Sequence, residues 1–369
     1  MRIFSYLARE TLTTMIGVGV ILLVVVISGR FVKYLAEAAA GKLAADVLVS
    51  IIVYRLPGFL ELILPLALFI GILLAYGRLY VESEMVVMSA CGVSTQRLLL
   101  YTMVPAMLVA AMVGGLSLYI TPLGAARVEA IFDDPTTATG VSALAGGRFQ
   151  PDDSGEAVTY AETVGGTDQR MEYVFLSARE IDSRGRSRLT LTLAESGAIR
   201  TDPENGNRYL ELHNGYRYQG NAGERDFSVV KFQRMGELIH DDTDNLGGQQ
   251  KSDAKTTQDL LNSQRLEDVA ALQWRLSLPL LVPVVALMAM SLSRTDHRRG
   301  RFIKLLPAFL LYIVYLVALS AARDAVEKGS LPDRPGIWGV HAVFFLIALA
   351  LLYLPGWWQR RRYTRLSSA

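Results

Sequence analysis

Two basic residues, Arg30 and Lys33, come directly after an uncharged stretch at residues 11–29. Since they are three residues apart, they share one face of a helix that continues beyond that stretch. Arginine and lysine in such a place can bind the phosphate groups of an anionic lipid. The alternative is that both side chains only reach from a membrane-spanning helix to the polar interface, which needs no ligand.

A second possible interaction site is the segment 78–92. Residues 80–90 predict a short helix that ends at Gly92, because glycine is favoured just past a helix end. The apolar face of this helix would contain Val81, Met85 and Met88. Two interpretations stay open: the helix packs against a bundle of other helices, or it docks into a groove of a soluble partner.

Two ionisable residues, Arg55 and Glu61, flank a further apolar stretch. They are six residues apart and therefore do not share a helix face, which excludes an ion pair along one helix. A lone carboxylate inside a membrane needs a partner or a water-filled cavity, so Glu61 is a functional candidate. Arg55 can simply lie at the membrane interface.

Several kinds of active site are excluded by residue spacing. Gly41-Lys42 does not belong to a Walker A motif, because Ala36 and Leu43 break the pattern. No HExxH or Gly-x-Ser-x-Gly motif is present. Metal-ligand spacing is also missing among the four histidines, His213, His240, His297 and His341. We therefore expect no metal, no cofactor and no ATPase activity of the chain itself; an intramembrane enzyme is excluded less strongly.

The charges divide the 369 residues into two populations. Residues 121–270 hold 25 of the 35 acidic residues but only 16 of the 37 basic ones, a net charge of −9, and the rest of the chain carries +11. The overall charge of +2 gives no reason to expect nucleic-acid binding. With 51% hydrophobic residues, the composition excludes a disordered chain.

Long apolar stretches lie at both ends of the chain. A helix needs about 20 apolar residues to cross a membrane. Six segments qualify as spans, the second only with its flanking residues: 11–29, 62–77, 98–126, 276–293, 305–322 and 335–359. The first is too long for a signal peptide, and Arg30 and Lys33 separate it from the small residues 38–40 that could be cleaved.

The distribution of lysine and arginine predicts the orientation of these spans. With both termini in the cytoplasm, the cytoplasmic segments 1–10, 77–97, 294–304 and 360–369 hold 13 basic residues, and the opposite short loops 30–46 and 323–334 hold 6. The acidic middle region then lies outside the cytoplasm. Cys91, the single cysteine, falls in a cytoplasmic loop, so the outer region has no disulfide.

The middle region, residues 127–270, predicts a β domain. Short alternating runs recur between turn signals such as Asn214-Gly215, which favours a sandwich, barrel or jelly roll. Five leucines are expected to point inward: Leu189, Leu191, Leu193, Leu210 and Leu212. The interior is either a filled core or a groove for an apolar ligand. Residues 240–264 are predicted to be a polar linker.

Several longer stretches resemble one protein family, the LptF/LptG permeases of lipopolysaccharide export, and its F-type subunit more than its G-type subunit. The resemblance covers nearly the whole chain. The stretches that carry it are residues 6–12, 62–69, 77–85 with Ala90-Cys91-Gly92, 143–150, 225–227 and 305–308.

The resemblance implies an α-helical membrane protein with an inserted β-jelly roll. Residues 1–126 would form three spans and a cytoplasmic coupling helix at 78–92, residues 127–270 a periplasmic β-jelly-roll domain, and residues 271–369 three more spans with a basic cytoplasmic tail. The chain would be a permease subunit of an ABC transporter in the bacterial inner membrane. It would pass lipopolysaccharide to a periplasmic bridge toward the outer membrane.

The resemblance also implies partners and site residues. The partners would be a G-type permease subunit, a cytoplasmic ATPase dimer that binds the ATP, and a single-span periplasmic accessory protein. Arg30 and Lys33 would contact the phosphates of the lipid head group. The ATPase would be contacted by Glu84, Glu82, Tyr80 and Met88. The jelly-roll groove for lipid would be lined by Leu176, Leu191, Leu193, Leu212, Tyr218 and Phe227. Arg55 receives no role.

A membrane receptor or scaffold whose β domain senses a ligand of the cell envelope fits the composition and topology equally well. Copurification of an ATPase would distinguish the transporter from it. An intramembrane enzyme would have to form product without a nucleotide.

Overall fold

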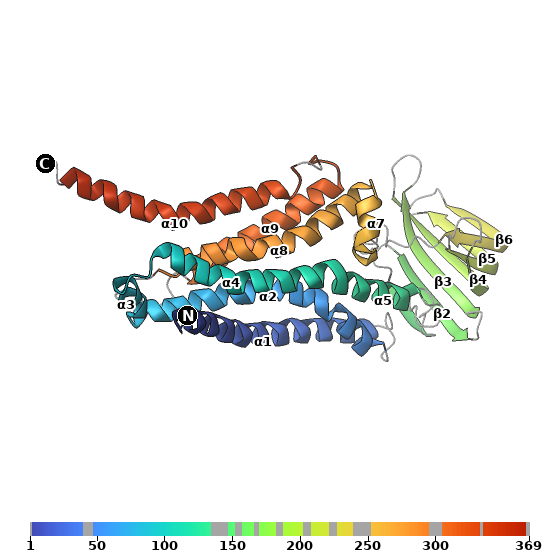
Figure 1. Cartoon of the computed structure of the whole chain (residues 1–369). Coiled ribbons are helices and arrows are strands. Elements are labelled where there is room, and N and C mark those ends of the chain that lie inside the picture. Colours follow the sequence, from blue (N-terminus) through green and yellow to red (C-terminus); the bar gives the residue numbers. More distant parts are fainter. Residues whose placement is uncertain are drawn as a thin grey trace. The chain divides into compact units, whose positions relative to one another are not determined.

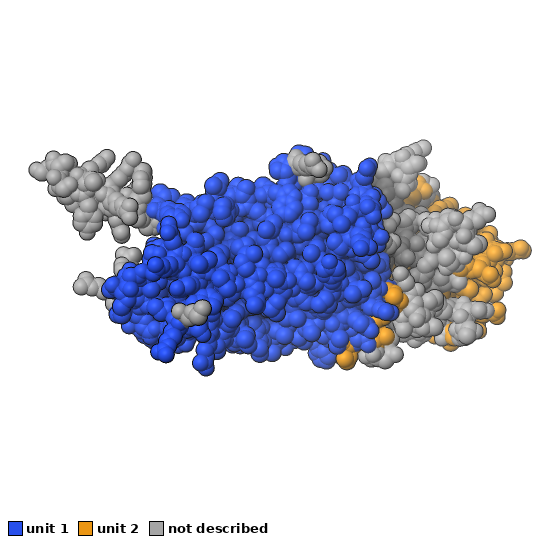
Figure 2. All heavy atoms as spheres, in the orientation of Figure 1, with its two compact units in different colours: residues 1–32, 50–129, 249–369 blue, residues 33–49, 130–248 orange. Residues whose placement is uncertain are grey.

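The structure is a computed structural model of the chain. It describes residues 2–39, 47–133, 147–151, 157–165, 170–181, 187–201, 208–220, 227–238, 252–294, 305–332 and 335–366. The chain divides into two compact units (Figure 2). We call Met1–Val32, Ser50–Glu129 and Gln249–Ala369 the helical unit, and Lys33–Val49 with Ala130–Gly248 the β unit.

Long helices make up most of the helical unit (Figure 1). They are α1 (Arg2–Ala39), α2 (Leu48–Val81), α4 (Thr95–Gly115), α5 (Thr121–Asp133), α8 (Leu266–Leu292), α9 (Leu305–Glu327) and α10 (Trp338–Leu366). A π-helical turn, η1 (Leu116–Ile120), joins α4 to α5 in one continuous helix. Two short helices, α3 (Glu84–Ala90) and α7 (Thr257–Asn262), complete the unit.

Five of these helices are long and apolar enough to cross a membrane: α1, α2, the continuous helix of α4, η1 and α5, α8, and α9. They coincide with the first five predicted spans. The sixth predicted span falls on α10, whose apolar part Trp338–Leu354 is shorter than 18 residues. The chain is therefore a multi-pass membrane protein, and its described part contains five helices that are able to span a membrane.

Close packing in the middle of the helical unit depends on a small residue and on aromatic stacking. A Cβ atom at Gly71 of α2 would lie 3.0 Å from the backbone of Met15 in α1, so glycine allows these helices to touch. Phe69 of α2 stacks on Tyr312 of α9, with 5.4 Å between the ring centroids. Helix α8 contacts α4, α9 and α10, and much of its length is buried. The apolar stretches thus form a bundle around α8.

The described residues of the β unit form one antiparallel sheet of six strands. They are β1 (Arg148–Pro151), β2 (Ala157–Gly165), β3 (Arg170–Ile181), β4 (Ser187–Thr201), β5 (Arg208–Gly220) and β6 (Ser228–Leu238), and they lie in the sheet in their order along the chain (Figure 1). Sequential order makes the described strands a meander, whereas a jelly roll is built from Greek keys. The β structure predicted for residues 127–270 is confirmed for 148–238, whereas the described ends of that region, up to Asp133 and from Thr257, are helical.

Strands β4 and β5 each cover two of the predicted short runs, so the turn predicted at Asn214-Gly215 is wrong. Asn214 does have the left-handed conformation that such a turn requires, with φ 51°, and Tyr173 on β3 has φ 50°. In the register of β3, β4 and β5, these two residues and Glu195 on β4 do not take part in the regular residue pairing. The regular pairing of the sheet is therefore interrupted along this line, and each strand continues through it without reversing direction.

The leucines of β4 do not all point into the core as predicted. Leu189 and Leu193 are 37% and 44% exposed. The buried side chains of β4 include Thr190, Thr192 and Ala194, which belong to the opposite face of the strand. The prediction is wrong for Leu189, Leu191 and Leu193, because these leucines share one face of β4 and the threonine face packs inward instead. Leu210 and Leu212 of β5 are buried, as predicted.

Candidate functional site

The predicted coupling segment joins α2 to α4 through the short helix α3. Ser83, with φ 62°, breaks the chain direction between α2 and α3. Met85 anchors α3 because its side chain is buried in the core of the helical unit. The helix ends at Cys91, and the following Gly92 has φ 89°, which confirms the predicted glycine at the helix end. Helix α3 begins at Glu84, four residues later than predicted.

The four residues predicted to contact an ATPase have different surroundings. Glu84, half-buried, accepts a 2.8 Å hydrogen bond from the hydroxyl of Tyr6. Glu82 is exposed and lies 3.8 Å from the guanidinium of Arg78. Tyr80 and Met88 are partly buried against the core. Of these four residues, only the two glutamates therefore offer a carboxylate at the surface of this segment.

Two exposed valines of α3 were missed by the sequence prediction. Val86 and Val87 are 58% and 60% exposed. Of the predicted apolar face, Met85 and Met88 pack against the helical bundle, which is one of the two interpretations left open, whereas Val81 is 37% exposed. A partner that docks on α3 would meet an acidic residue, Glu84, beside these two valines. The sequence signal was present, since four apolar residues from Met85 to Met88 exceed what one buried face needs.

Arg30 and Lys33 both lie in α1 and are both exposed. The guanidinium of Arg30 lies 5.5 Å from the centroid of the Phe59 ring of α2. A cation held over an aromatic face keeps its charge and its outward hydrogen-bond donors. Arg30 can therefore bind an anion while the ring of Phe59 restricts its movement.

One face of the sheet exposes aromatic and apolar side chains. Directly opposite residues in an antiparallel sheet project to the same face. The register places five residues in one row across β1 to β5: Phe149, Tyr160, Phe175, Leu193 and Tyr216. Leu191 and Tyr218 are partners on the same face. The ring of Phe227 lies 6.1 Å from that of Tyr218.

The six residues predicted to line a lipid groove do not share one face. Leu191, Leu193 and Tyr218 lie on the aromatic face, and Phe227 contacts it. Leu176 is the partner of Thr192, which neighbours Leu193 in the strand and so belongs to the opposite face. Leu212 is fully buried in the core of the β unit. A groove on the aromatic face would therefore exclude Leu176 and Leu212.

The buried carboxylate of Glu61 has partners within the helical unit. It is 7% exposed and accepts a 2.9 Å hydrogen bond from the hydroxyl of Thr121. Arg275 of α8 interacts with it electrostatically. Arg55, on the same helix as Glu61, is half-buried. Glu61 therefore lies at one end of a larger network of polar contacts, which we call the polar junction. This junction connects α2, the third span (the continuous helix of α4, η1 and α5) and α8.

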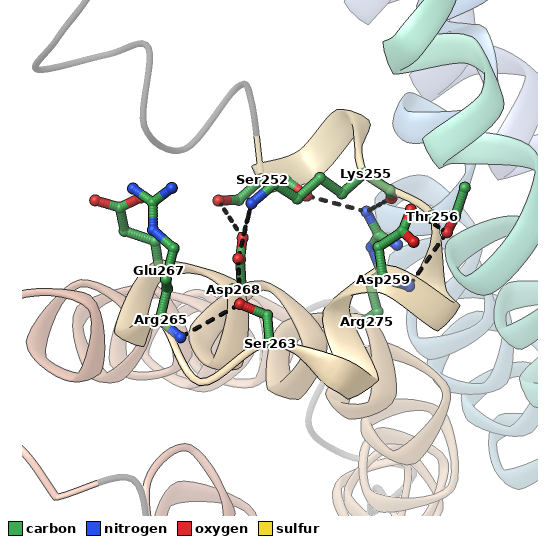
Figure 3. A network of polar contacts seen from close by, with 9 residues as sticks. All are labelled: Ser252, Lys255, Thr256, Asp259, Ser263, Arg265, Glu267, Asp268 and Arg275. Atoms are coloured by element: carbon green, nitrogen blue, oxygen red, sulfur yellow. Dashed lines mark hydrogen bonds and ion pairs between the residues drawn. The ribbon is translucent and has the colours of Figure 1, made fainter.

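The centre of this junction is Asp268, at the start of α8 (Figure 3). Its carboxylate accepts hydrogen bonds from Ser252 at 2.9 Å, from Lys255 at 2.7 Å and from Ser263 at 2.6 Å. These donors belong to the segment 240–264, which was predicted to be a polar linker. For residues 252–264 that prediction is wrong, because their polar side chains bind α8 and α7 forms among them.

Arg275, about two helical turns after Asp268 in α8, holds the same segment from its other side (Figure 3). Its guanidinium donates to the carbonyl oxygens of Ser252, Asp253 and Lys255 and to the hydroxyl of Thr257, at 2.8 to 3.3 Å. Arg275 is only 4% exposed. These four bonds account for the burial of a charged side chain, which would otherwise be costly.

The π-helical turn η1 is part of the junction. The hydroxyl of Ser117 donates to the carbonyl oxygen of Arg275, and Thr257 donates to the carbonyl oxygen of Leu118. A π-helical turn disturbs the regular hydrogen-bond ladder and frees carbonyl groups for such contacts. The junction therefore fixes residues 252–257 to the third span as well as to α8.

Replacing Arg275 with methionine should destabilise the helical unit strongly. The substitution leaves several backbone carbonyls unpaired and removes the cation that faces Glu61 and Asp253. We expect a loss of about 3–5 kcal/mol in the free energy of unfolding, as for other broken buried charge networks. Denaturant unfolding of the purified protein in detergent measures it.

Arg265→Met is the matched control, since the Arg265 side chain is 69% exposed and pairs only with Glu267 among the ion pairs of the described part. Its effect should stay within about 0.5 kcal/mol. Equal losses in the two variants would contradict the structural role of Arg275.

Comparison with known proteins agrees with this architecture. Residues 5–354 match the family model described as lipopolysaccharide export system permease LptF/LptG. The lipopolysaccharide export system permease protein LptF of Escherichia coli K12 is 32% identical over 359 residues, which cover 95% of this chain and 94% of the relative. The same values hold for the protein of that name from Shigella flexneri. The chain therefore belongs to the LptF/LptG family of lipopolysaccharide export permeases.

Proposed function

We propose that this protein is the F-type membrane subunit of an ABC transporter that extracts lipopolysaccharide from the inner membrane. It passes the lipid to a periplasmic bridge toward the outer membrane, and a separate ATPase supplies the energy. The observation that carries the proposal is the family match over residues 5–354, which includes both the helical and the β unit. The chain itself catalyses no covalent step and needs no cofactor.

Six spans and cytoplasmic termini complete the proposed topology. Helix α10 continues to Leu366, beyond its apolar part Trp338–Leu354, and is therefore long enough to cross a membrane of about 30 Å. With 13 basic residues on the cytoplasmic side against 6 in the opposite loops, the β unit is periplasmic. We propose that its six-stranded sheet is the main part of a β-jelly roll.

The ATPase dimer acts on α3. Helix α3 presents the carboxylate of Glu84 and the exposed Val86 and Val87, a combination suited to a groove with a cation at its edge. Closure of the ATPase on ATP pushes α3, and the buried Met85 transmits the movement to the bundle. Glu82, Tyr80 and Met88 support this contact from the same segment.

Lipopolysaccharide enters between this chain and a G-type permease subunit. Arg30 and Lys33 bind the phosphates of its head group, because both are exposed cations on the outer part of α1. When the cavity between the subunits shrinks, the acyl chains move to the aromatic face of the β unit. There Leu191, Leu193 and Tyr218, with Phe227, offer apolar contact area. A single-span accessory protein continues the path.

Copurification tests the proposal. The tagged chain, extracted from native membranes in mild detergent, should retain a G-type permease, an ATPase with a Walker A motif, the accessory protein and bound lipopolysaccharide. Mass spectrometry identifies the proteins and the phosphorylated lipid. Recovery of the lipid without any ATPase would instead support a receptor or scaffold of the envelope.

A further inference from the structure

The first turns of α1 are fastened to the coupling segment by two side-chain contacts. Tyr6 donates a hydrogen bond of 2.8 Å to Oε2 of Glu84. One turn later, Oε2 of Glu10 accepts a bond of 2.7 Å from Nη2 of Arg78, at the end of α2. Tyr6 and Glu10 are four residues apart and therefore lie on the same face of α1. That face of α1 is thus directed at the segment from Arg78 to Glu84.

The bond from Tyr6 reaches Glu84, whose carboxylate is proposed as the main polar contact with the ATPase. A carboxylate has two oxygens and about four acceptor sites, so one hydrogen bond fixes its direction and still leaves room for a partner's donor. Glu84 directly follows Ser83, whose left-handed backbone separates α3 from α2. Without a contact to α1, the side chain of Glu84 would be oriented only by this bend and by its own rotamer preferences.

We infer that Tyr6 is a positioning residue for Glu84, and that the N-terminal turns of α1 belong to the coupling unit of the transporter. This inference rests on the proposed function, because it assigns a role to a residue that acts through the ATPase contact. Helix α1 is continuous over 38 residues and also carries Arg30. At about 1.5 Å per residue, the 24 residues between Tyr6 and Arg30 span roughly 36 Å. A movement of α3 is therefore passed directly to the helix that holds the lipid head group.

If the bond had a purely structural role, its loss would lower the unfolding temperature of the complex. We expect no such change. A hydrogen bond at an exposed site contributes little to stability, so its loss should leave the unfolding temperature of the complex unchanged. Positioning of Glu84 affects the ATPase contact instead. The two roles are therefore separated by measuring stability and coupling in the same preparations.

The test uses the complete complex in vesicles that contain lipopolysaccharide. Tyr6→Phe removes only the hydroxyl, and we expect about a fivefold fall in lipid released per ATP and in the affinity of the ATPase for the permease pair, as for the loss of one typical hydrogen bond. The unfolding temperature and the KM for ATP should stay unchanged. Tyr101→Phe is the matched control, because the tilted ring of Tyr101 lies 5.6 Å from that of Phe4 and its hydroxyl makes no hydrogen bond within the described part of the chain.

The affinity measurement is repeated in a Glu84→Ala background, where Tyr6→Phe should have no further effect. An equal loss from Tyr6→Phe in both backgrounds, or no loss in the presence of Glu84, would overturn the positioning role while leaving the proposed function intact. Wild-type affinity and release in Glu84→Ala alone would overturn both the positioning role and the proposed contact of Glu84 with the ATPase, whereas the transport function itself is tested by copurification of the ATPase.

Discussion

Replacing Glu84 with arginine should stop ATP-driven release of lipopolysaccharide while the permease stays folded. The substitution puts a positive charge where the carboxylate is expected to pair with a cation of the ATPase. Breaking such a pair costs several kcal/mol, so we expect a loss on the order of a hundredfold in release. Since Glu84 is only half-buried and accepts one bond from Tyr6 in the described part of the chain, folding should be little affected. Lipid release from reconstituted vesicles, followed alongside thermal unfolding, measures both.

Glu82→Arg serves as the control for Glu84→Arg. It makes the same charge change two residues earlier, at an exposed glutamate near Arg78. We expect a smaller loss from it, because its closest cation is in its own helix turn. If both variants lost lipid release equally, release would depend on the overall charge of the coupling segment and not on the position of Glu84.

The double substitution Arg30→Ala and Lys33→Ala should abolish capture of the lipid. Each charge-assisted bond to a phosphate is worth about 1.5–3 kcal/mol, so each residue should change the apparent affinity for lipopolysaccharide by roughly tenfold or more. Site-specific crosslinking from α1 to lipopolysaccharide measures the loss. ATP hydrolysis by the partner should continue, because the coupling segment is unchanged.

Two further variants show whether the lipid responds to the two cations on α1 or to the total surface charge. The exchange Arg30→Lys with Lys33→Arg keeps the charge and should restore most of the crosslinking. Arg127→Ala removes an exposed arginine from α5 and should leave it unchanged. Equal loss in Arg127→Ala would mean that the lipid responds to total surface charge and not to the pair on α1.

The helical unit was predictable because long apolar stretches are strong signals of spanning helices. Five of the six stretches correspond to helices long enough to span. The end of α3 at Gly92 was also predictable, since glycine accepts φ 89° without strain. In contrast, the bond between Tyr6 and Glu84 joins residues 78 positions apart, and no local pattern indicates such a contact.

The β unit was less predictable because side-chain types do not determine which face of a strand is buried. In β4 the leucines alternate with threonines, and hydrophobicity alone favours burying the leucines. The register instead aligns Leu193 with Phe175 and Tyr216, on a face that stays exposed. Asn214 was predicted to lie in a turn and does have a left-handed backbone, with φ 51°, but it lies within β5, and the strand continues through it without reversing direction.

Crosslinking from the aromatic face of the β unit tests the central claim most directly. A photoreactive residue at Leu193 or Tyr218, in the complete complex in vesicles, should capture lipopolysaccharide only when ATP is hydrolysed. The capture should disappear in both the Glu84→Arg and the Arg30→Ala/Lys33→Ala variants. Capture of the lipid at the same level without ATP, or in these variants, would contradict transport from α1 to the β unit.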